Sequence, residues 1–376
     1  MNIEQKTAFD FPTLFSLPDP TEIPQRAWLC GNHLIRRNVS VTLAPGGVGK
    51  SSFSIVQALE LATGRRLLTT WNAGPLKVWL FNLEDEREEL NRRFCGAAMH
   101  YGISREDISD RLFIDSGREN QLILAEQNRD SIVLNRGLIA YLKRTILEHN
   151  IDVLIVDPFV SSHLINEMDN GKMDVVTKTW IGIADEANIA IELIHHTRKL
   201  NGAEATSDAS RGASSLVNAA RSSRVLQKFT NEELVKAGVK DLNGTYFYVK
   251  RDKSNLAVGG GKETFRTVSV SLGQGDNVGV VERFQFPSTF DGIGQRELIK
   301  VQRCIDGKGL RYSDQTGSQW VGNAIARVLD LDPVEDKSRI LSLIREWLLS
   351  GALVKKSRRQ SNGKFVPEID VGEWAN

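Results

Sequence analysis

Short apolar runs alternate with longer amphipathic segments through the first half of the chain. The apolar runs, which predict strands, cover residues 38–44, 76–85, 151–157 and 189–196. The segments with helical apolar spacing, which predict helices, cover residues 51–64, 86–100, 134–150 and 173–188. This alternation predicts an α/β domain whose mainly parallel, twisted sheet is covered by helices on both faces. In such domains ligands bind at the carboxyl ends of the strands.

The pattern changes after residue 222. Strand-like segments, expected to extend the sheet in antiparallel fashion, cover residues 224–229, 244–253, 263–273 and 278–286. Three amphipathic helices are predicted at 296–307, 317–331 and 336–351, followed by a hairpin at 352–371 with its turn at 361–363. Three helices and a hairpin predict a small winged-helix-like domain. The expected division is an extended lead-in (1–22), a larger α/β domain (23–286), a linker (287–294) and the winged-helix-like domain (295–376).

Composition narrows the class of protein. The chain has 376 residues, of which 41% are hydrophobic and 25% charged, and its net charge is +1. It has no apolar run long enough to span a bilayer and no amino-terminal secretion signal, so we expect a cytoplasmic protein that does not bind a membrane. Cys30, Cys95 and Cys304 lie far apart, which favours neither a disulfide framework nor a zinc site. A balanced net charge still allows DNA to bind through local basic loops.

A glycine-rich loop joins the first predicted strand to the first predicted helix. The sequence APGGVGKS, Ala44–Ser51, fits the spacing of a phosphate-binding P-loop, with Ala44 in place of the usual first glycine. Backbone N–H groups of such a loop surround phosphates, the lysine adds a positive charge and the serine hydroxyl binds magnesium. An ordinary glycine turn before a helix is the alternative interpretation. The predicted cofactors are ATP and Mg²⁺, and the predicted nucleotide-binding residues are Gly46, Gly47, Val48, Gly49, Lys50, Ser51 and Ser52.

Acidic residues end two of the other predicted strands. Asp157 follows a buried strand, where a carboxylate can hold the magnesium ion together with Ser51. Glu84, in the sequence FNLED, is the candidate that polarises the attacking water, and Asp85 competes for this role. An acid at the start of a helix also stabilises the helix dipole, which suits Asp85 and Glu86 better.

His195 and His196 end the last strand of the alternating region. One of them can hydrogen-bond to the γ-phosphate and transmit its removal to the loop that follows as a change of conformation, while the other is structural. That loop, residues 197–215, has small, polar and basic residues, and its Arg198, Lys199 and Arg211 are candidates for contacts with DNA phosphates. A plain surface loop is the alternative.

In this order, the P-loop, FNLED, LIVDP, LIHH and ASRGASSLVNAAR resemble the RecA-like ATPases of hexameric plasmid-replication helicases of the RepA type, over roughly residues 23–256. FNLED also resembles the corresponding strand end of DnaB-type helicases. The resemblance implies a RecA-like P-loop NTPase core, with Lys50, Ser51, Glu84 and Asp157 at the nucleotide and His196 as sensor.

The resemblance also implies an arginine finger. Arg221 matches the position of the arginine that reaches into the neighbouring subunit's nucleotide, so it would make hydrolysis depend on assembly. Arg224 or Lys253 are alternatives for this role, and a plain surface arginine is the simpler interpretation of Arg221.

The carboxyl-terminal domain is not part of the short plasmid helicases. Its basic residues Lys355, Lys356, Arg358 and Arg359 lie on the predicted hairpin, as a wing that crosses duplex DNA requires. A charged edge hairpin that resists aggregation is the alternative. Trp320 and Trp347 fit apolar helical patterns and are expected in the core.

The expected function is that of a hexameric ATP-dependent DNA helicase that moves on single-stranded DNA during replication of a plasmid, phage or integrated element. Alternatives are an ATP-regulated DNA-binding initiator or regulator, and a RecA-like loader or recombination mediator that does not unwind DNA. A small-molecule kinase is disfavoured because no acceptor-site pattern is present.

Overall fold

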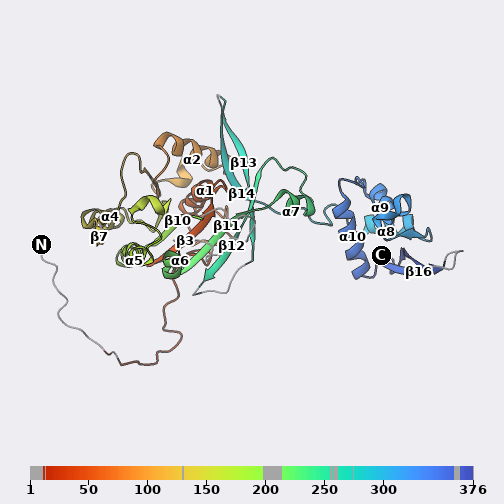
Figure 1. Cartoon of the computed structure of the whole chain (residues 1–376), viewed down its shortest axis with the longest axis horizontal. Coiled ribbons are helices and arrows are strands. Elements are labelled where there is room, and N and C mark those ends of the chain that lie inside the picture. Colours follow the sequence, from red (N-terminus) through yellow and green to blue (C-terminus); the bar gives the residue numbers. More distant parts are fainter. Residues whose placement is uncertain are drawn as a thin grey trace.

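The structure is a computed structural model that describes residues 12, 14–128, 131–197, 214–254, 256, 261–273, 275–359 and 365–375. A nine-stranded sheet forms the larger part, in the order β14-β13-β12-β11-β3-β10-β8-β4-β5 (Figure 1). Its strands are β3 (Asn38–Pro45), β4 (Val78–Asn82), β5 (Leu112–Ser116), β8 (Val153–Asp157), β10 (Ala190–Thr197), β11 (Ser222–Lys228), β12 (Thr245–Ser254), β13 (Glu263–Gly273) and β14 (Asp276–Arg283). The six strands from β11 to β5 are parallel, and four of them, β3, β4, β8 and β10, are the strands that the alternating pattern predicted.

Helices cover both faces of this sheet. They are α1 (Lys50–Thr63), α2 (Arg87–Tyr101), α3 (Arg105–Ile108), α4 (Arg136–His149), α5 (Asn170–Glu186), α6 (Ser214–Ala219) and α7 (Asn231–Lys236). Successive residues of a strand face opposite sides, so in β8 Ile155 packs in the core beneath α1 and α2, while Leu154 packs in the core beneath α4 and α5. The four strands and four helices predicted in the alternating region are confirmed.

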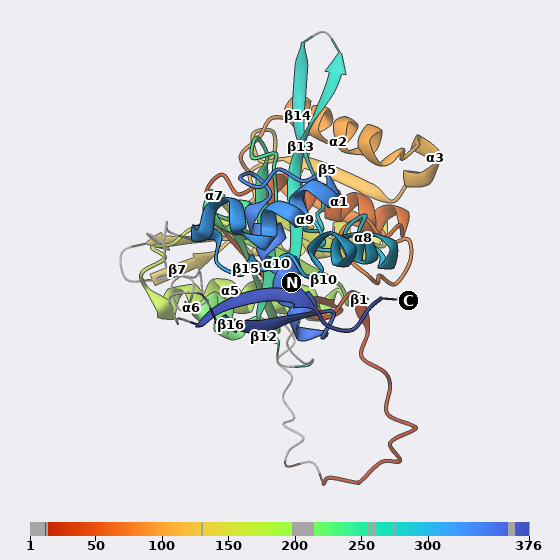
Figure 2. The same ribbon diagram turned by 90° about the vertical axis from the view of Figure 1, so that its right-hand side faces the viewer.

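The strands after residue 222 differ from the prediction in one respect. β11 joins β3 in parallel, and only β12, β13 and β14 are antiparallel to their neighbours. The long β13–β14 hairpin projects beyond the sheet beside α2 (Figure 2). Gly96 of α2 permits this contact, because a methyl group there would lie 2.1 Å from Val278 Cγ2 of β14.

Several short elements were not predicted. A hairpin of β1 (Trp28–Cys30) and β2 (Leu34–Ile35) precedes β3. A second sheet combines β6 (Ala125–Asn128), β7 (Ser131–Leu134) and β9 (His163–Leu164), and the 3-10 helix η1 (Phe159–Ser162) lies between β8 and β9. The β1–β2 hairpin lies near the start of β3, and the second sheet lies next to η1, where the N–H of Leu124 donates to the carbonyl of Ser162 at 2.9 Å.

The carboxyl-terminal part has its own core. It contains α8 (Gln295–Ile305), β15 (Leu310–Arg311), the 3-10 helix η3 (Asp314–Gln319), α9 (Val321–Leu329), α10 (Lys337–Leu349), β16 (Leu353–Arg359) and β17 (Phe365–Val371). Trp320 and Trp347 are buried in that core, as predicted. The three helices and the antiparallel hairpin β16–β17 are confirmed, whereas the expected turn at 361–363 lies outside the described residues.

The two parts meet through α7 and the start of α10. Lys240 Nζ lies 3.0 Å from Asp336 Oδ1, and Ser338 Oγ donates to the carbonyl of Lys236 at 2.9 Å. Among the described residues, no helix has both the length and the apolar character that crossing a bilayer requires.

Candidate nucleotide site

The glycine loop lies between the end of β3 and the start of α1. Gly47 and Gly49 have φ values of 71° and 97°, in the left-handed region that favours glycine. Gly46 faces open space, since a methyl group there would have nothing within 4 Å, and the buried side chain of Val48 holds the loop against the core. The loop therefore presents backbone rather than side chains at the first turn of α1, where Ser51 and Ser52 lie half-buried.

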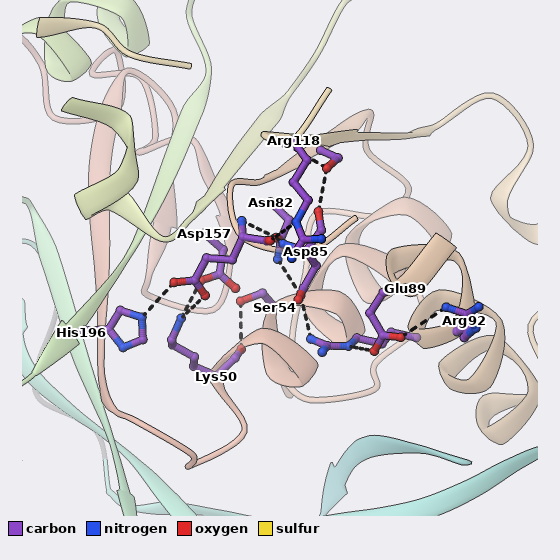
Figure 3. Close-up of polar contacts among 12 residues, drawn as sticks. Lys50, Ser54, Asn82, Asp85, Glu89, Arg92, Arg118, Asp157 and His196 are labelled. Carbon is purple, nitrogen blue, oxygen red and sulfur yellow. Dashed lines mark hydrogen bonds and ion pairs between the residues drawn. The ribbon is translucent and has the colours of Figure 1, made fainter. Parts of the chain in front are cut away.

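Lys50 is surrounded by acids at this edge of the sheet. Its Nζ donates to Asp157 Oδ1 at 3.1 Å and lies 3.9 Å from Glu84 Oε2 (Figure 3). Asp157 ends β8 and is only 1% exposed, and its Oδ2 is buried without a hydrogen-bond partner among the described residues. A buried carboxylate oxygen without a hydrogen bond is uncommon, and a bound ion or water would satisfy it.

Glu84 and Asp85 have different surroundings. Asp85 accepts a hydrogen bond from Arg93 Nη1 at 2.9 Å, so it is bound to the helix that follows. Glu84 is half exposed, and its carboxylate lies between Lys50 and His196, with Oε1 3.8 Å from His196 Nε2. The geometry therefore favours Glu84 over Asp85 as the group that faces the nucleotide.

The two histidines point to different environments. His196 is partly exposed beside Glu84, and burial together with the charge of Lys50 lowers its pKa. His195 is buried against Phe159 with its Nδ1 3.6 Å from Glu167 Oε1, and burial lowers its pKa to about 4. His195 is thus a neutral core residue, and His196 is the one placed to sense a phosphate.

The residues at this edge fit ATP with Mg²⁺. The glycine loop and Lys50 match a polyphosphate, while the Ser51 hydroxyl and the Asp157 carboxylate are the hard oxygen donors that Mg²⁺ prefers. The buried Oδ2 of Asp157 would gain a partner from the ion or its water shell.

Arg221 lies at the opposite end of the sheet. Its backbone N–H donates to the carbonyl of Val39 at 3.1 Å, at the start of β3, and its side chain is exposed. Six residues of strand, about 20 Å, separate Val39 from Pro45 at the glycine loop. Arg221 therefore does not reach the glycine loop of its own chain.

The two alternatives to Arg221 as the finger residue bind groups of their own chain. Arg224 is buried, and it donates to Thr42 Oγ1 and to Gln57 Oε1, each at 2.7 Å. Lys253 Nζ donates to the carbonyls of Val217 and Asn218, at 3.1 and 2.7 Å. Arg224 is thus enclosed in the core, which removes it as a candidate for contact with another subunit.

The candidate DNA-contacting residues divide into two groups. Arg198, Lys199 and Arg211 lie outside the described residues. The four cations of the hairpin differ in their contacts. Lys355 Nζ lies 3.7 Å from the centre of the Tyr312 ring and Lys356 donates to Asp370 at 2.8 Å, whereas Arg358 and Arg359 are exposed on β16.

Sequence reasoning missed the residues that hold the turn after β4. Asn82 ends β4, is 2% exposed and accepts hydrogen bonds from the N–H groups of Glu84 and Asp85. The FNLED sequence contains this asparagine, and a strand-terminal asparagine followed by polar residues is a known turn signal.

A family model described as an AAA domain matches residues 5–202, more than half of the chain. The matched range contains Lys50, Glu84, Asp157 and His196, and it ends before Arg221 and before the carboxyl-terminal part.

Proposed function

The chain belongs to the AAA domain family and is accordingly an ATPase. From this premise, we propose that it is an ATP-dependent DNA helicase. In this proposal six copies form a ring that moves along single-stranded DNA, in the replication of a plasmid, phage or integrated element. The RecA-like, RepA-type resemblance of the motifs supports this assignment.

The nucleotide site supports hydrolysis through separate roles for its residues. Lys50, now paired with Asp157, would turn to the β and γ phosphates, and Ser51 and Asp157 would hold Mg²⁺. The ion, when bound, neutralises charge on the phosphates. Glu84 would polarise the attacking water, and His196, 3.8 Å from Glu84, would sense the γ-phosphate.

One observation carries the proposal of an assembly. Arg221 is exposed and lies about 20 Å of strand away from its own glycine loop. If it acts in hydrolysis, it must do so at the nucleotide of another copy, where its guanidinium would neutralise charge on the transferred phosphoryl group. A ring of copies supplies such an arginine to every site.

The helicase assignment is tested with DNA and ATP together. We expect single-stranded DNA to stimulate ATP hydrolysis and a forked duplex to be opened only when ATP is hydrolysed. Electron microscopy of the protein with ATP and single-stranded DNA should show particles with sixfold symmetry. Hydrolysis that ignores DNA, with no opening of the fork, would contradict the assignment.

A second candidate function is a DNA-binding replication initiator or regulator whose assembly state depends on ATP. The carboxyl-terminal part favours it, because this part has its own core and exposes Arg358 and Arg359 on an edge hairpin. We propose that this part is a winged-helix-like domain that contacts duplex DNA. Binding of one specific duplex without unwinding would support the regulator. Loading or strand-exchange activity without unwinding would support a RecA-like mediator instead.

A further inference from the structure

The turn that carries Glu84 is held by its backbone rather than by its carboxylate. Asn82 Oδ1 accepts from the N–H of Glu84 at 3.0 Å and from the N–H of Asp85 at 2.7 Å (Figure 3). A side-chain oxygen that accepts from residues two and three positions later replaces the backbone acceptor of a turn. Asn82 therefore fixes the direction in which the chain leaves β4.

The neighbouring strand end holds the same turn from the other side. Ser116 ends β5, pairs in register with Asn82, and its Oγ donates to the carbonyl of Asp85 at 2.6 Å. Arg118 Nε donates to the carbonyl of Glu84 at 2.9 Å. Gly117 lets the two segments touch, since a methyl group there would lie 2.7 Å from Leu83 Cα. Four hydrogen bonds thus hold the backbone of Glu84 and Asp85.

The side chain of Glu84 has no comparable restraint. Its carboxylate is half exposed, and its contacts with Lys50 and His196 are long, at 3.9 and 3.8 Å. The position of the carboxylate is therefore set mainly by the backbone from which it departs.

We propose that Asn82, Ser116 and Arg118 form a clamp that positions the Glu84 carboxylate for its work on the attacking water. These three are positioning residues, because they hydrogen-bond to the backbone of the turn. The inference rests on the proposed function of Glu84 as the water-polarising group. A displacement of about 1 Å in a catalytic group costs on the order of 100-fold in rate, so the clamp should act on turnover and not on binding.

The first experiment measures kcat and KM for ATP hydrolysis in the full-length protein, and the affinity for a fluorescent ATP analogue. We expect Asn82→Ala to lower kcat about 10- to 100-fold and Arg118→Ala about 10-fold, with KM and analogue affinity within about twofold of wild type. Arg118 is a surface residue, so its variant tests the clamp even where Asn82→Ala disturbs folding.

Two further variants separate positioning from a general loss of structure. Ser116→Ala removes the Oγ donor to the carbonyl of Asp85 but leaves the other three hydrogen bonds to the turn, so it should retain a kcat well above that of Asn82→Ala. Arg92→Ala is the matched control, because Arg92 is a partly exposed arginine of the same charged region that pairs with Glu89 and Asp276 and not with the turn. The control should keep wild-type kcat. Equal losses in Arg92→Ala and Arg118→Ala would overturn the clamp.

The decisive readout is the combination with Glu84→Gln. Residues that act through Glu84 should cause no further loss of the residual turnover once the carboxylate is gone, whereas independent structural effects would add. Additive losses, or an unchanged kcat in Asn82→Ala and Arg118→Ala, would overturn the clamp. The proposed function would still stand in that case if Glu84→Gln itself strongly lowers turnover. Wild-type turnover in Glu84→Gln would remove the proposed role of Glu84 and the clamp with it.

Discussion

Two charged clusters lie in the same sheet, and they differ in what surrounds each charge. In the nucleotide site, Lys50 faces Asp157 and Glu84, one Asp157 oxygen has no partner, and Glu84 is half exposed. Beneath it, Glu192 of β10 is fully buried between Arg224 and His33, with His33 Nε2 2.7 Å from its Oε2.

The second cluster completes its charges from within the chain. Thr42 Oγ1 donates to Glu192 and accepts from Arg224 Nε, and Arg224 also lies 4.7 Å from the centre of the Phe53 ring. Burial by itself raises the pKa of Glu192, but the neighbouring His33, Arg224 and Thr42 side chains outweigh it, so the net pKa lies below its usual value. A buried charge that is paired within the chain thus stabilises the fold, whereas one that is only partly paired is available to bind a ligand.

The largest expected effect is on hydrolysis. Lys50→Ala should lower the rate of ATP hydrolysis by about 1,000-fold or more, because it removes the positive charge at the β and γ phosphates. The free energy of unfolding should also fall, by about 3–5 kcal/mol, because the change leaves the buried Asp157 carboxylate without its counter-ion. Lys143→Ala, which removes a surface lysine paired with Glu186, is the control. A Lys50→Ala protein that hydrolyses ATP within tenfold of wild type would contradict the site.

The next effect is on stability and belongs to the buried cluster. Arg224→Met should lower the free energy of unfolding by about 3–5 kcal/mol, because it leaves the Glu192 charge buried without its main counter-ion. Urea unfolding measures this change. The double variant Glu192→Gln with Arg224→Met should recover part of the loss, because no unpaired charge remains. A loss below about 1 kcal/mol in Arg224→Met would show that the cluster does not support the fold.

The smallest expected effect concerns pH. Burial lowers the pKa of His163 to about 4, against 6.5 for a free ring. Above pH 6.5 the ring is neutral in both states, and below it only the unfolded chain takes up the proton. The free energy of unfolding should therefore fall by about 2 kcal/mol per such ring between pH 7 and pH 5.

His163→Asn isolates this contribution. The asparagine oxygen can replace Nδ1, which accepts the N–H of Ile165 at 3.2 Å, but it does not titrate. Urea unfolding at pH 7 and at pH 5 should show a smaller difference in the variant than in the wild type. Equal differences in the wild type and the variant would mean that protonation of His163 does not change the free energy of unfolding.

Local pattern was enough to predict most of the parallel sheet and the glycine loop. β4 and β8 are apolar up to their last residue because both faces are covered, and polar residues of the site stand at their carboxyl ends. β5 was missed because it is an edge strand with partly exposed residues and Asp115 in its middle. β9 was missed because its two residues become a strand only by pairing with β6, far away in sequence.

The site was predicted less completely than the sheet. The choice between Glu84 and Asp85 depends on Arg93, which reaches back from α2, and no spacing within FNLED reveals that contact. The clamp joins the ends of two strands that are more than 30 residues apart, so it exists only once β4 and β5 are paired. Arg221 was found through a resemblance, and the structure adds that it lies far from its own glycine loop.

The central claim is that the nucleotide on one chain is completed by Arg221 of another, and mixing two inactive variants tests it most directly. Lys50→Ala lacks a working P-loop but keeps Arg221, while Arg221→Ala keeps the P-loop and should bind an ATP analogue with wild-type affinity. Each alone should hydrolyse ATP poorly, and a mixture of the two should recover a substantial fraction of wild-type turnover, because mixed assemblies pair an intact P-loop with an intact arginine. A mixture that never exceeds the sum of its components, or Arg221→Ala protein that is fully active alone, would contradict the claim.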